Sequence, residues 1–166
     1  MLDTQSILFE GLLLSVIFLA IVLLSLYYNP RLWLQDFPKD IQQMTLPKTK
    51  QEKRQTIFLT MLIFILFLSP FFTSLYIDND QIALWPAFLH FFFIFTIVSL
   101  VDLVILDWLI ICFFTPSFLI VPGSHGAKGY KDYWFHLVGA LKGTFICAAF
   151  ALLLAGLRVA ISYLCI

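Results

Sequence analysis

The chain has 166 residues, of which 61% are hydrophobic and 12% are charged, and its formal net charge is zero. Soluble domains are about half apolar and about a quarter charged, so this composition excludes an ordinary soluble globular protein. It predicts an integral membrane protein, for which we expect membrane lipids and no nucleic acid as partners.

Four hydrophobic runs reach the roughly 20 residues that a helix needs to cross a bilayer. They cover residues 7–28, 56–76, 84–114 and 134–164. The last two exceed the minimum, so we expect these helices to be tilted or to extend past the lipid. The N-terminal run lacks a basic flank and a cleavage pattern, which predicts a retained helix rather than a signal peptide. The predicted fold is all-α, a single transmembrane domain that forms a four-helix bundle.

Basic residues between these runs predict the orientation. Segment 29–55 carries six of the Lys and Arg residues, and segment 115–133 carries two, whereas the N-terminal end and residues 78–81 carry none. Since Lys and Arg loops stay in the cytoplasm, both longer loops are predicted to be cytoplasmic and both termini to lie outside. The expected location is the plasma (inner) membrane.

The first loop mixes aromatic and polar residues from Tyr27 to Pro38, as a segment in the headgroup zone does. Pro30 is expected to end the first helix near Asn29, and Thr49 and Glu52 have capping-box spacing before the second run. Four nearby cations are interpreted as topology determinants. Alternatively they attract anionic headgroups at roughly 1 kcal/mol each; these residues are Lys48, Lys50, Lys53 and Arg54.

Ionisable groups inside a membrane cost about 2.5–3.5 kcal/mol each on insertion scales, so each needs a partner or a purpose. In the third run, Thr96, Ser99, Asp102 and Asp107 fall within roughly 140° of a helix and predict a polar side that faces the bundle interior. Lys142 lies at the depth of Asp107, which predicts an ion pair. The alternative is that Lys142 extends to the cytoplasmic interface.

The fourth run has small residues at every fourth position, which allow close approach of helix backbones. We expect this seam to pack within the chain, with association with another chain as the alternative. Its members are Gly139, Gly143, Cys147, Ala151 and Ala155.

Polar and aromatic residues gather where the fourth helix begins. With Asp107, Lys142 and His125 they would surround a cytoplasm-facing vestibule that does acid–base chemistry or binds a polar headgroup. Because no spacing matches a catalytic motif, the favoured interpretation is an aromatic belt with a few charges, and the functional vestibule is the alternative. The cluster contains Tyr130, Lys131, Asp132, Tyr133, Trp134 and His136. His136, Asp107 and Lys131 are the candidate acid–base groups. The glycine-rich loop has no phosphate-binding fingerprint, and the three cysteines form no CxxC pair, so no cofactor or metal is predicted.

Two stretches, NPRLWLQDFPKDIQ and DWLI…TPSFLIVPGSHGAKGYKDYWFHLVGALKG, resemble small four-helix bacterial membrane proteins of unassigned activity. This resemblance implies the fold and a bacterial plasma membrane, and it carries over no functional residue.

Three functions are compatible with the sequence. The first is an accessory or interaction subunit of a larger membrane complex, which the small size and the absence of a soluble domain favour. The second is an oligomeric transporter or channel for a small solute or protons that uses Asp102, Asp107 and Lys142. The third is a lipid-modifying enzyme with its site at the cytoplasmic face. Since no catalytic motif is present, the sequence favours a protein that is not an enzyme.

Overall fold

The computed structural model describes residues 3–77 and 82–164, and every element in these ranges is a helix. Four of the helical segments are long and apolar enough to cross a membrane: Thr4–Tyr28, Lys50–Tyr76, Leu84–Phe114 and Tyr133–Leu164. The prediction of an all-α chain with four such helices is confirmed. The turn at residues 78–81 and Cys165 lie outside the described residues.

Local capping sets the ends of the first two long helices. Helix α1 (Thr4–Tyr28) begins after Asp3, whose carboxylate accepts bonds from the backbone N–H groups of Gln5 and Ser6. It ends before Asn29 and Pro30, as predicted. Helix α3 (Lys50–Phe67) begins with the predicted capping box of Thr49 and Glu52. Between them lie the 3₁₀ helix η1 (Pro30–Asp36) and the short helix α2 (Lys39–Met44).

The second apolar run is interrupted near its end. Helix α3 stops at Phe67, and α4 (Ser69–Ile77) begins after Leu68. Pro70 has no N–H to donate to the preceding turn and disfavours a continuous α-helix at this point.

The third run changes its helical type. Helix α5 (Leu84–Val101) continues without a gap as the π-helix η2 (Asp102–Phe114). It ends at Thr115, whose left-handed backbone (φ 45°) turns the chain and whose N–H donates to the Ile110 carbonyl at 2.9 Å. The 3₁₀ helices η3 (Ser117–Leu119) and η4 (Lys128–Lys131) follow, and α6 (Tyr133–Leu164) completes the fold.

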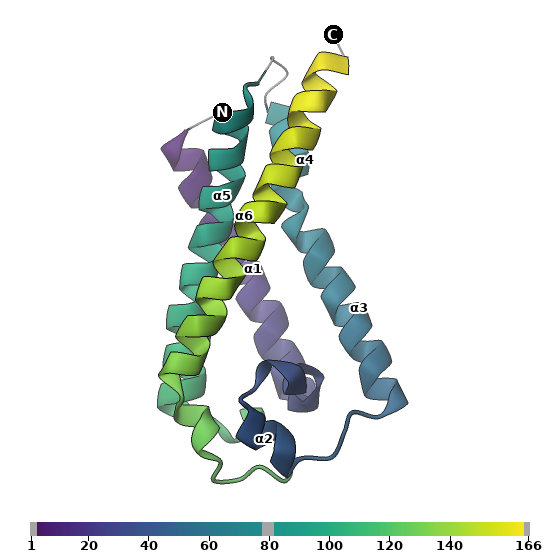
Figure 1. The fold of residues 1–166 in the computed structure, drawn as a ribbon, viewed down its shortest axis with the longest axis vertical. Coiled ribbons are helices and arrows are strands. Elements are labelled where there is room, and N and C mark those ends of the chain that lie inside the picture. The colour runs from purple at the N-terminus through teal and green to yellow at the C-terminus, as the bar shows by residue number, and fades with distance from the viewer. Residues whose placement is uncertain (1–2, 78–81, 165–166) are drawn as a thin grey trace.

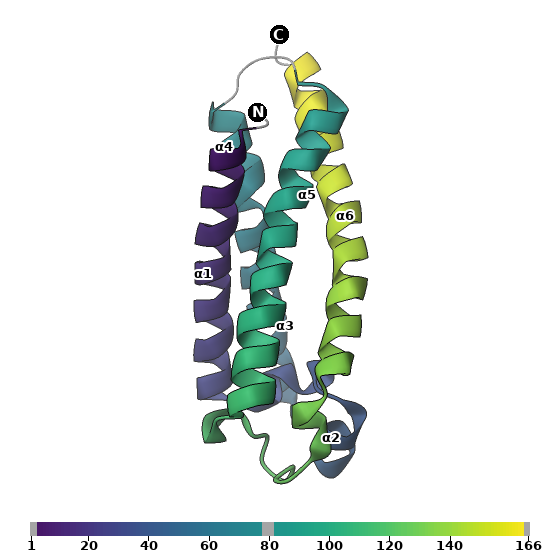
Figure 2. The ribbon, with the colours of Figure 1, turned by 90° about the vertical axis from the view of Figure 1, so that its left-hand side faces the viewer.

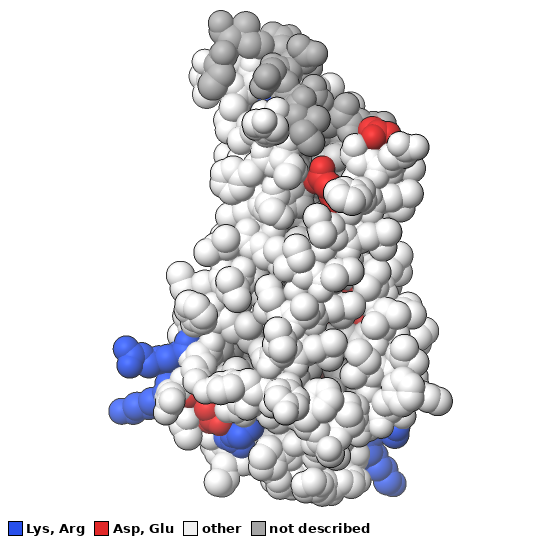
Figure 3. Space-filling model, turned by 180° about the vertical axis from the view of Figure 1, so that it is seen from behind, with Lys and Arg blue, Asp and Glu red and all other residues white. Residues whose placement is uncertain are grey.

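The long helices run roughly along one axis, with the beginning of α1 and the end of α6 at the same end (Figures 1 and 2). Lys and Arg side chains gather at the other end (Figure 3), where η1, α2, η3 and η4 also lie. We call this the basic end.

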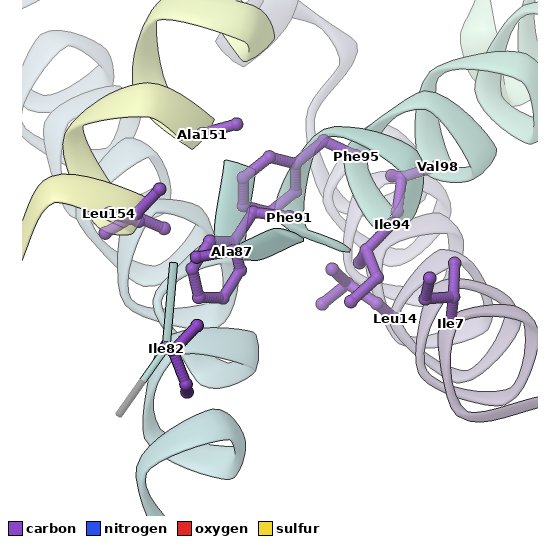
Figure 4. Packing of buried hydrophobic residues seen from close by; sticks show 11 residues of the cluster. Ile7, Leu14, Ile82, Ala87, Phe91, Ile94, Phe95, Val98, Ala151 and Leu154 are labelled. Carbon is purple, nitrogen blue, oxygen red and sulfur yellow. The ribbon is translucent and has the colours of Figure 1, made fainter. Parts of the chain in front are cut away.

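An apolar core joins α1, α5 and α6 near the termini (Figure 4). Phe91 and Phe95 are completely buried there, as are Ala151 and Ala155 of the small-residue seam. The seam therefore packs against α5 within the chain at these two positions. In the structure, Gly11 of α1 also allows close contact with Ile97 of α5.

A second apolar cluster closes the basic end. Leu119 and Val121 are completely buried there, and the Phe37 ring packs edge-on against Tyr130 at 5.6 Å. The Asp40 carboxylate accepts a 2.8 Å bond from the Gly129 N–H, which joins the two loops. We call residues 30–44 and 117–131 the floor of the bundle, because they pack beneath its helices.

Helix α3 diverges from α6 toward the basic end (Figure 1). It is held at its upper part by the Phe67 ring, which lies 5.5 Å from Phe95 and 5.7 Å from Phe18. At its base, Arg31 of η1 forms a 2.6 Å ion pair with Glu52.

Candidate functional site: a polar cavity above the floor

A cavity of about 420 Å³ lies between α1, η1, η2 and α6, at the basic end of the bundle. Its polar lining comes from residues far apart in the sequence. These residues are Gln35, Asp36, Ser99, Asp102, Asp107 and His136, and the wall is completed by aromatic, aliphatic and glycine residues.

The strongest interaction in this cavity joins α6 to η2. The Nδ1 atom of His136 lies 2.9 Å from an Asp107 carboxylate oxygen, and both side chains are largely buried, at 6% and 18% exposed. An imidazole nitrogen that faces a carboxylate carries the proton. The pairing therefore leaves the other nitrogen of a neutral His136, Nε2, as an acceptor.

The π-helix brings Asp102 to the same cavity as Asp107. In an α-helix, side chains five residues apart point about 140° away from each other. In a π-helix the bonds run from residue i to i+5, so residues five apart lie close to one face. Asp102 and Asp107 have this spacing, and both line the cavity. The angle between the Asp102 and Asp107 side chains is therefore smaller than it would be in an α-helix.

Two acceptor atoms around the cavity have no hydrogen-bond partner within the described residues. They are an Asp102 carboxylate oxygen and His136 Nε2, and both atoms are buried. Buried polar atoms are nearly always paired with protein, water or a ligand. Asp102 is also close enough to Asp107 and His136 to interact with them electrostatically.

Asp36 is a member of the site that the sequence did not indicate. It ends η1 in the floor and lines the cavity with Gln35. Burial raises the pKa of its carboxyl above the ordinary value; Lys48 and a hydrogen bond with Gln35 oppose this shift, and Asp107 adds to it. The adjacent aromatic residues indicated an interfacial segment, and no local pattern indicates that this segment folds beneath the helices.

The expected ion pair between Asp107 and Lys142 is not formed in the structure. Lys142 is exposed and makes no ion pair within residues 3–77 and 82–164. His136 and Lys142 are six residues apart, which places them about 120° apart on an α-helix. His136 lies on the same helix face as Gly139 and Gly143. This spacing in the sequence could have indicated that His136, rather than Lys142, faces Asp107.

Other candidate residues lie outside the cavity lining. Lys131 donates to the Cys112 and Phe113 carbonyls at 2.6 and 2.9 Å, so it caps the end of η2 and is not placed for acid–base work. Asp132 accepts a bond from the Phe135 N–H at the start of α6. His125 is exposed, Tyr133 packs against Trp108, and the Tyr130 hydroxyl bonds to Val121 and Ser124 inside the floor.

Two glycines of the predicted seam form part of the cavity wall. A Cβ atom built on Gly139 or Gly143 would meet nothing within 4 Å. Of the remaining polar residues, Ser99 lines the cavity, whereas Thr96 donates to the Phe92 carbonyl of its own helix. The seam therefore contributes packing at Ala151 and Ala155 and open space at its two glycines.

Aromatic rings separate the cavity from the far end of the bundle. Phe95 stacks on Phe67 and lies 5.6 Å from Phe150, which contacts Phe64 at 5.8 Å. These rings come from α3, α5 and α6, and they adjoin the apolar core of Figure 4. We call this apolar layer of rings the roof of the cavity.

A second hollow of about 310 Å³ lies beside the cavity, between α1, η1 and α3. The two share Phe18, Trp33, Gln35 and Asp36 as lining residues. The rest of the second hollow is mainly aliphatic and hydroxylic, from Leu32, Thr56, Leu59, Thr60 and Ile63. The divergence of α3 thus leaves an apolar groove beside the polar cavity.

Among the described residues, no group of three or more His, Cys, Asp or Glu side chains is arranged to hold a metal ion. Comparison with protein-family models, curated protein sequences and solved structures finds no match.

Proposed function

We propose that this protein is a lipid-modifying membrane enzyme that binds a lipid headgroup in the cavity and uses His136 as a general base. The observation that carries this proposal is the pairing of His136 with Asp107 inside a cavity that has an apolar groove beside it. A carboxylate that orients a histidine and leaves its second nitrogen available is a recurrent acid–base arrangement.

The proposed setting is the plasma membrane of a bacterium, with four spans, both termini outside and the basic end in the cytoplasm. The four long apolar helices support the spans, and the gathering of Lys and Arg at one end supports the direction (Figure 3). Lys50, Lys53 and Arg54 are exposed at this end and are proposed to contact anionic headgroups. Lys48 bonds internally to Leu32, Gln35 and Thr56 and is left out of that set.

In the proposed mechanism, His136 Nε2 accepts a proton from the substrate while Asp107 holds the imidazole and stabilises its charged form. Asp102 lies in the same cavity and would hold a polar group of the substrate. The roof excludes water from the other side, and the groove beside α3 receives the apolar part of the lipid.

The apolar roof favours an enzyme over a transporter. Transport across the bundle needs a polar path between its ends, whereas Phe91, Phe95 and Ala151 are completely buried in the intervening core. The interaction-subunit hypothesis stays a prediction. Its proposed docking seam is already used within the chain at Ala151 and Ala155.

The test is lipid retention and lipid turnover by the purified protein in mild detergent. Native mass spectrometry should find a retained lipid on the wild type, and incubation with a total bacterial lipid extract should change the mass of one lipid class. His136→Gln should lower the turnover rate by about 100-fold or more, because general acid–base catalysis contributes that much.

His125→Gln is the matched control, because His125 is exposed and does not line the cavity. It should retain and convert lipid as the wild type does. Retention that depends on His136 without any mass change would leave the binding site in place and exclude the enzyme. Retention equal in both variants, with no turnover, would exclude the site.

A further inference from the structure

The charges around the cavity restrict its ligand. Three carboxylates line it, from Asp36, Asp102 and Asp107, and none of the described lining residues is Lys or Arg. Lys48 interacts with Asp36 but directs its ammonium group to Leu32, Gln35 and Thr56. An anionic group in this cavity would therefore meet acidic side chains and no Lys or Arg.

The two unpartnered atoms are both acceptors. An Asp102 oxygen accepts both in the ionised carboxylate and as the carbonyl oxygen of the neutral acid, and His136 Nε2 accepts because Nδ1 carries the proton that faces Asp107. His136 is itself only 6% exposed, so an unsatisfied nitrogen at this depth is costly. A ligand that donates hydrogen bonds would satisfy both atoms.

Aromatic side chains also line the site. Phe18, Trp33, Phe37 and Phe135 line the cavity beside the carboxylates. The Trp33 ring is fixed by a 2.8 Å bond from its Nε1–H to the Ser25 hydroxyl. Aromatic rings attract cations through the negative potential of their faces. Carboxylates, unpaired acceptors and aromatic rings in one cavity fit a cation that has N–H groups.

We propose that the cavity binds a primary ammonium group, carried by the headgroup of a membrane lipid whose chain lies in the groove between α1 and α3. This inference rests on the proposed function and names the substrate class of the same site. A free amine shares the ammonium chemistry, but it would leave the groove empty. The groove lies directly beside the cavity, because Phe18, Trp33, Gln35 and Asp36 line both.

The test compares three lysolipids of one chain length, added to the full-length protein in dodecyl maltoside and followed by calorimetry. Lysophosphatidylethanolamine carries a primary ammonium, lysophosphatidylcholine a quaternary one without N–H groups, and lysophosphatidylglycerol no cation. The ethanolamine lipid should bind about tenfold or more tightly than either of the others, as the loss of one charged hydrogen bond implies. Phosphoethanolamine without a chain should bind more weakly than its lysolipid.

Asp102→Asn should abolish most of this preference, and Glu10→Gln is the matched control. Glu10 is also a partly buried carboxylate, but it lies in α1 near the termini and accepts a bond from Thr73. If Asp102→Asn fails to fold, Gly139→Leu reports instead, because its side chain enters the cavity from an open position.

The outcomes separate the two proposals. Equal binding of all three lysolipids, lost in Asp102→Asn or Gly139→Leu, would overturn the ammonium inference and leave the lipid site intact. Equal binding of phosphoethanolamine and its lysolipid would replace the lipid by a free amine as the source. Binding that no cavity variant changes would overturn both the inference and the proposed function.

Discussion

The two nitrogens of the His136 imidazole have different surroundings. Nδ1 faces Asp107 at 2.9 Å, and Nε2 has no partner within the described residues. Because Nε2 is the nitrogen without a partner, it is both the proposed base and the proposed acceptor of a hydrogen bond from the ammonium ligand. The exposed His125, by contrast, does not line the cavity.

Asp36 should make the stability of the protein depend on pH. Its folded-state pKa is raised, chiefly by burial, against opposition from Lys48 and with a contribution from Asp107. Folding therefore favours the neutral form of Asp36. The stability that this preference contributes is fully present below the pKa of the unfolded state and is lost as pH rises through the pKa of the folded state. We expect the melting temperature of the ligand-free protein to fall across this range.

Asp36→Asn should remove this part of the fall, because an amide does not ionise. Melting curves of both proteins across about pH 4–8 measure the difference, because this range begins near the ordinary pKa of an aspartate and extends above it. Asp132→Asn is the exposed control. A fall of the same size in wild type and Asp36→Asn would show that other groups cause it.

At the scale of elements, the transition from α5 to the π-helix η2 decides where two carboxylates point. The transition occurs at Asp102, and the next aspartate follows five residues later. π-type turns are frequent at functional sites, and here the wider turn places both acids in the cavity. The nearby α3 lines the groove between its contacts at Phe67 above and at Glu52 below.

Gly11→Ala should destabilise the packing of α1 against α5. A Cβ atom at this position would lie 2.8 and 3.0 Å from Ile97 side-chain atoms, so Ile97 or the helix must shift. We expect a cost of about 1–3 kcal/mol, as for other additions to a well-packed core. Thermal or denaturant unfolding in detergent measures it.

Gly156→Ala is the matched control in α6, where an added Cβ atom meets nothing within 4 Å. It should stabilise the protein by about 0.5–1 kcal/mol, because alanine favours a helix interior over glycine. Equal effects of the two substitutions would contradict the close contact between α1 and α5.

At the scale of the whole molecule, the apolar core and the polar cavity lie in different halves of the bundle. The core near the termini contains Phe91 and Phe95, and the cavity lies above the floor at the basic end. A site confined to one end of the bundle suits chemistry at one leaflet. The side it faces depends on the proposed orientation, which the distribution of basic residues supports (Figure 3).

Single-cysteine labelling in intact cells tests that orientation. In a chain whose native cysteines are replaced by serine, cysteines at Lys50 and Lys128 should be protected from a membrane-impermeant maleimide, whereas one at Asp3 should react. All three positions are exposed in the structure. Reaction of Lys50→Cys and Asp3→Cys from the same side would mean that the helix count or the direction is wrong.

The sequence by itself determined the number of long apolar helices, the end of α1 before Pro30 and the capping box of α3. These features depend on hydropathy over one segment and on bonds between near neighbours, so local residues suffice. It also indicated that Ser99, Asp102, Asp107 and His136 are chemically relevant, because polar residues are rare in such runs.

Only the tertiary structure decided how these residues combine. It paired Asp107 with His136 instead of Lys142, brought Asp36 beneath the bundle, and moved Lys131 to the end of η2. These outcomes depend on the rotation of α6, on a π-helical turn and on the folding of distant loops. Helix depth can be counted along a sequence, but the facing of two helices is set by packing between them.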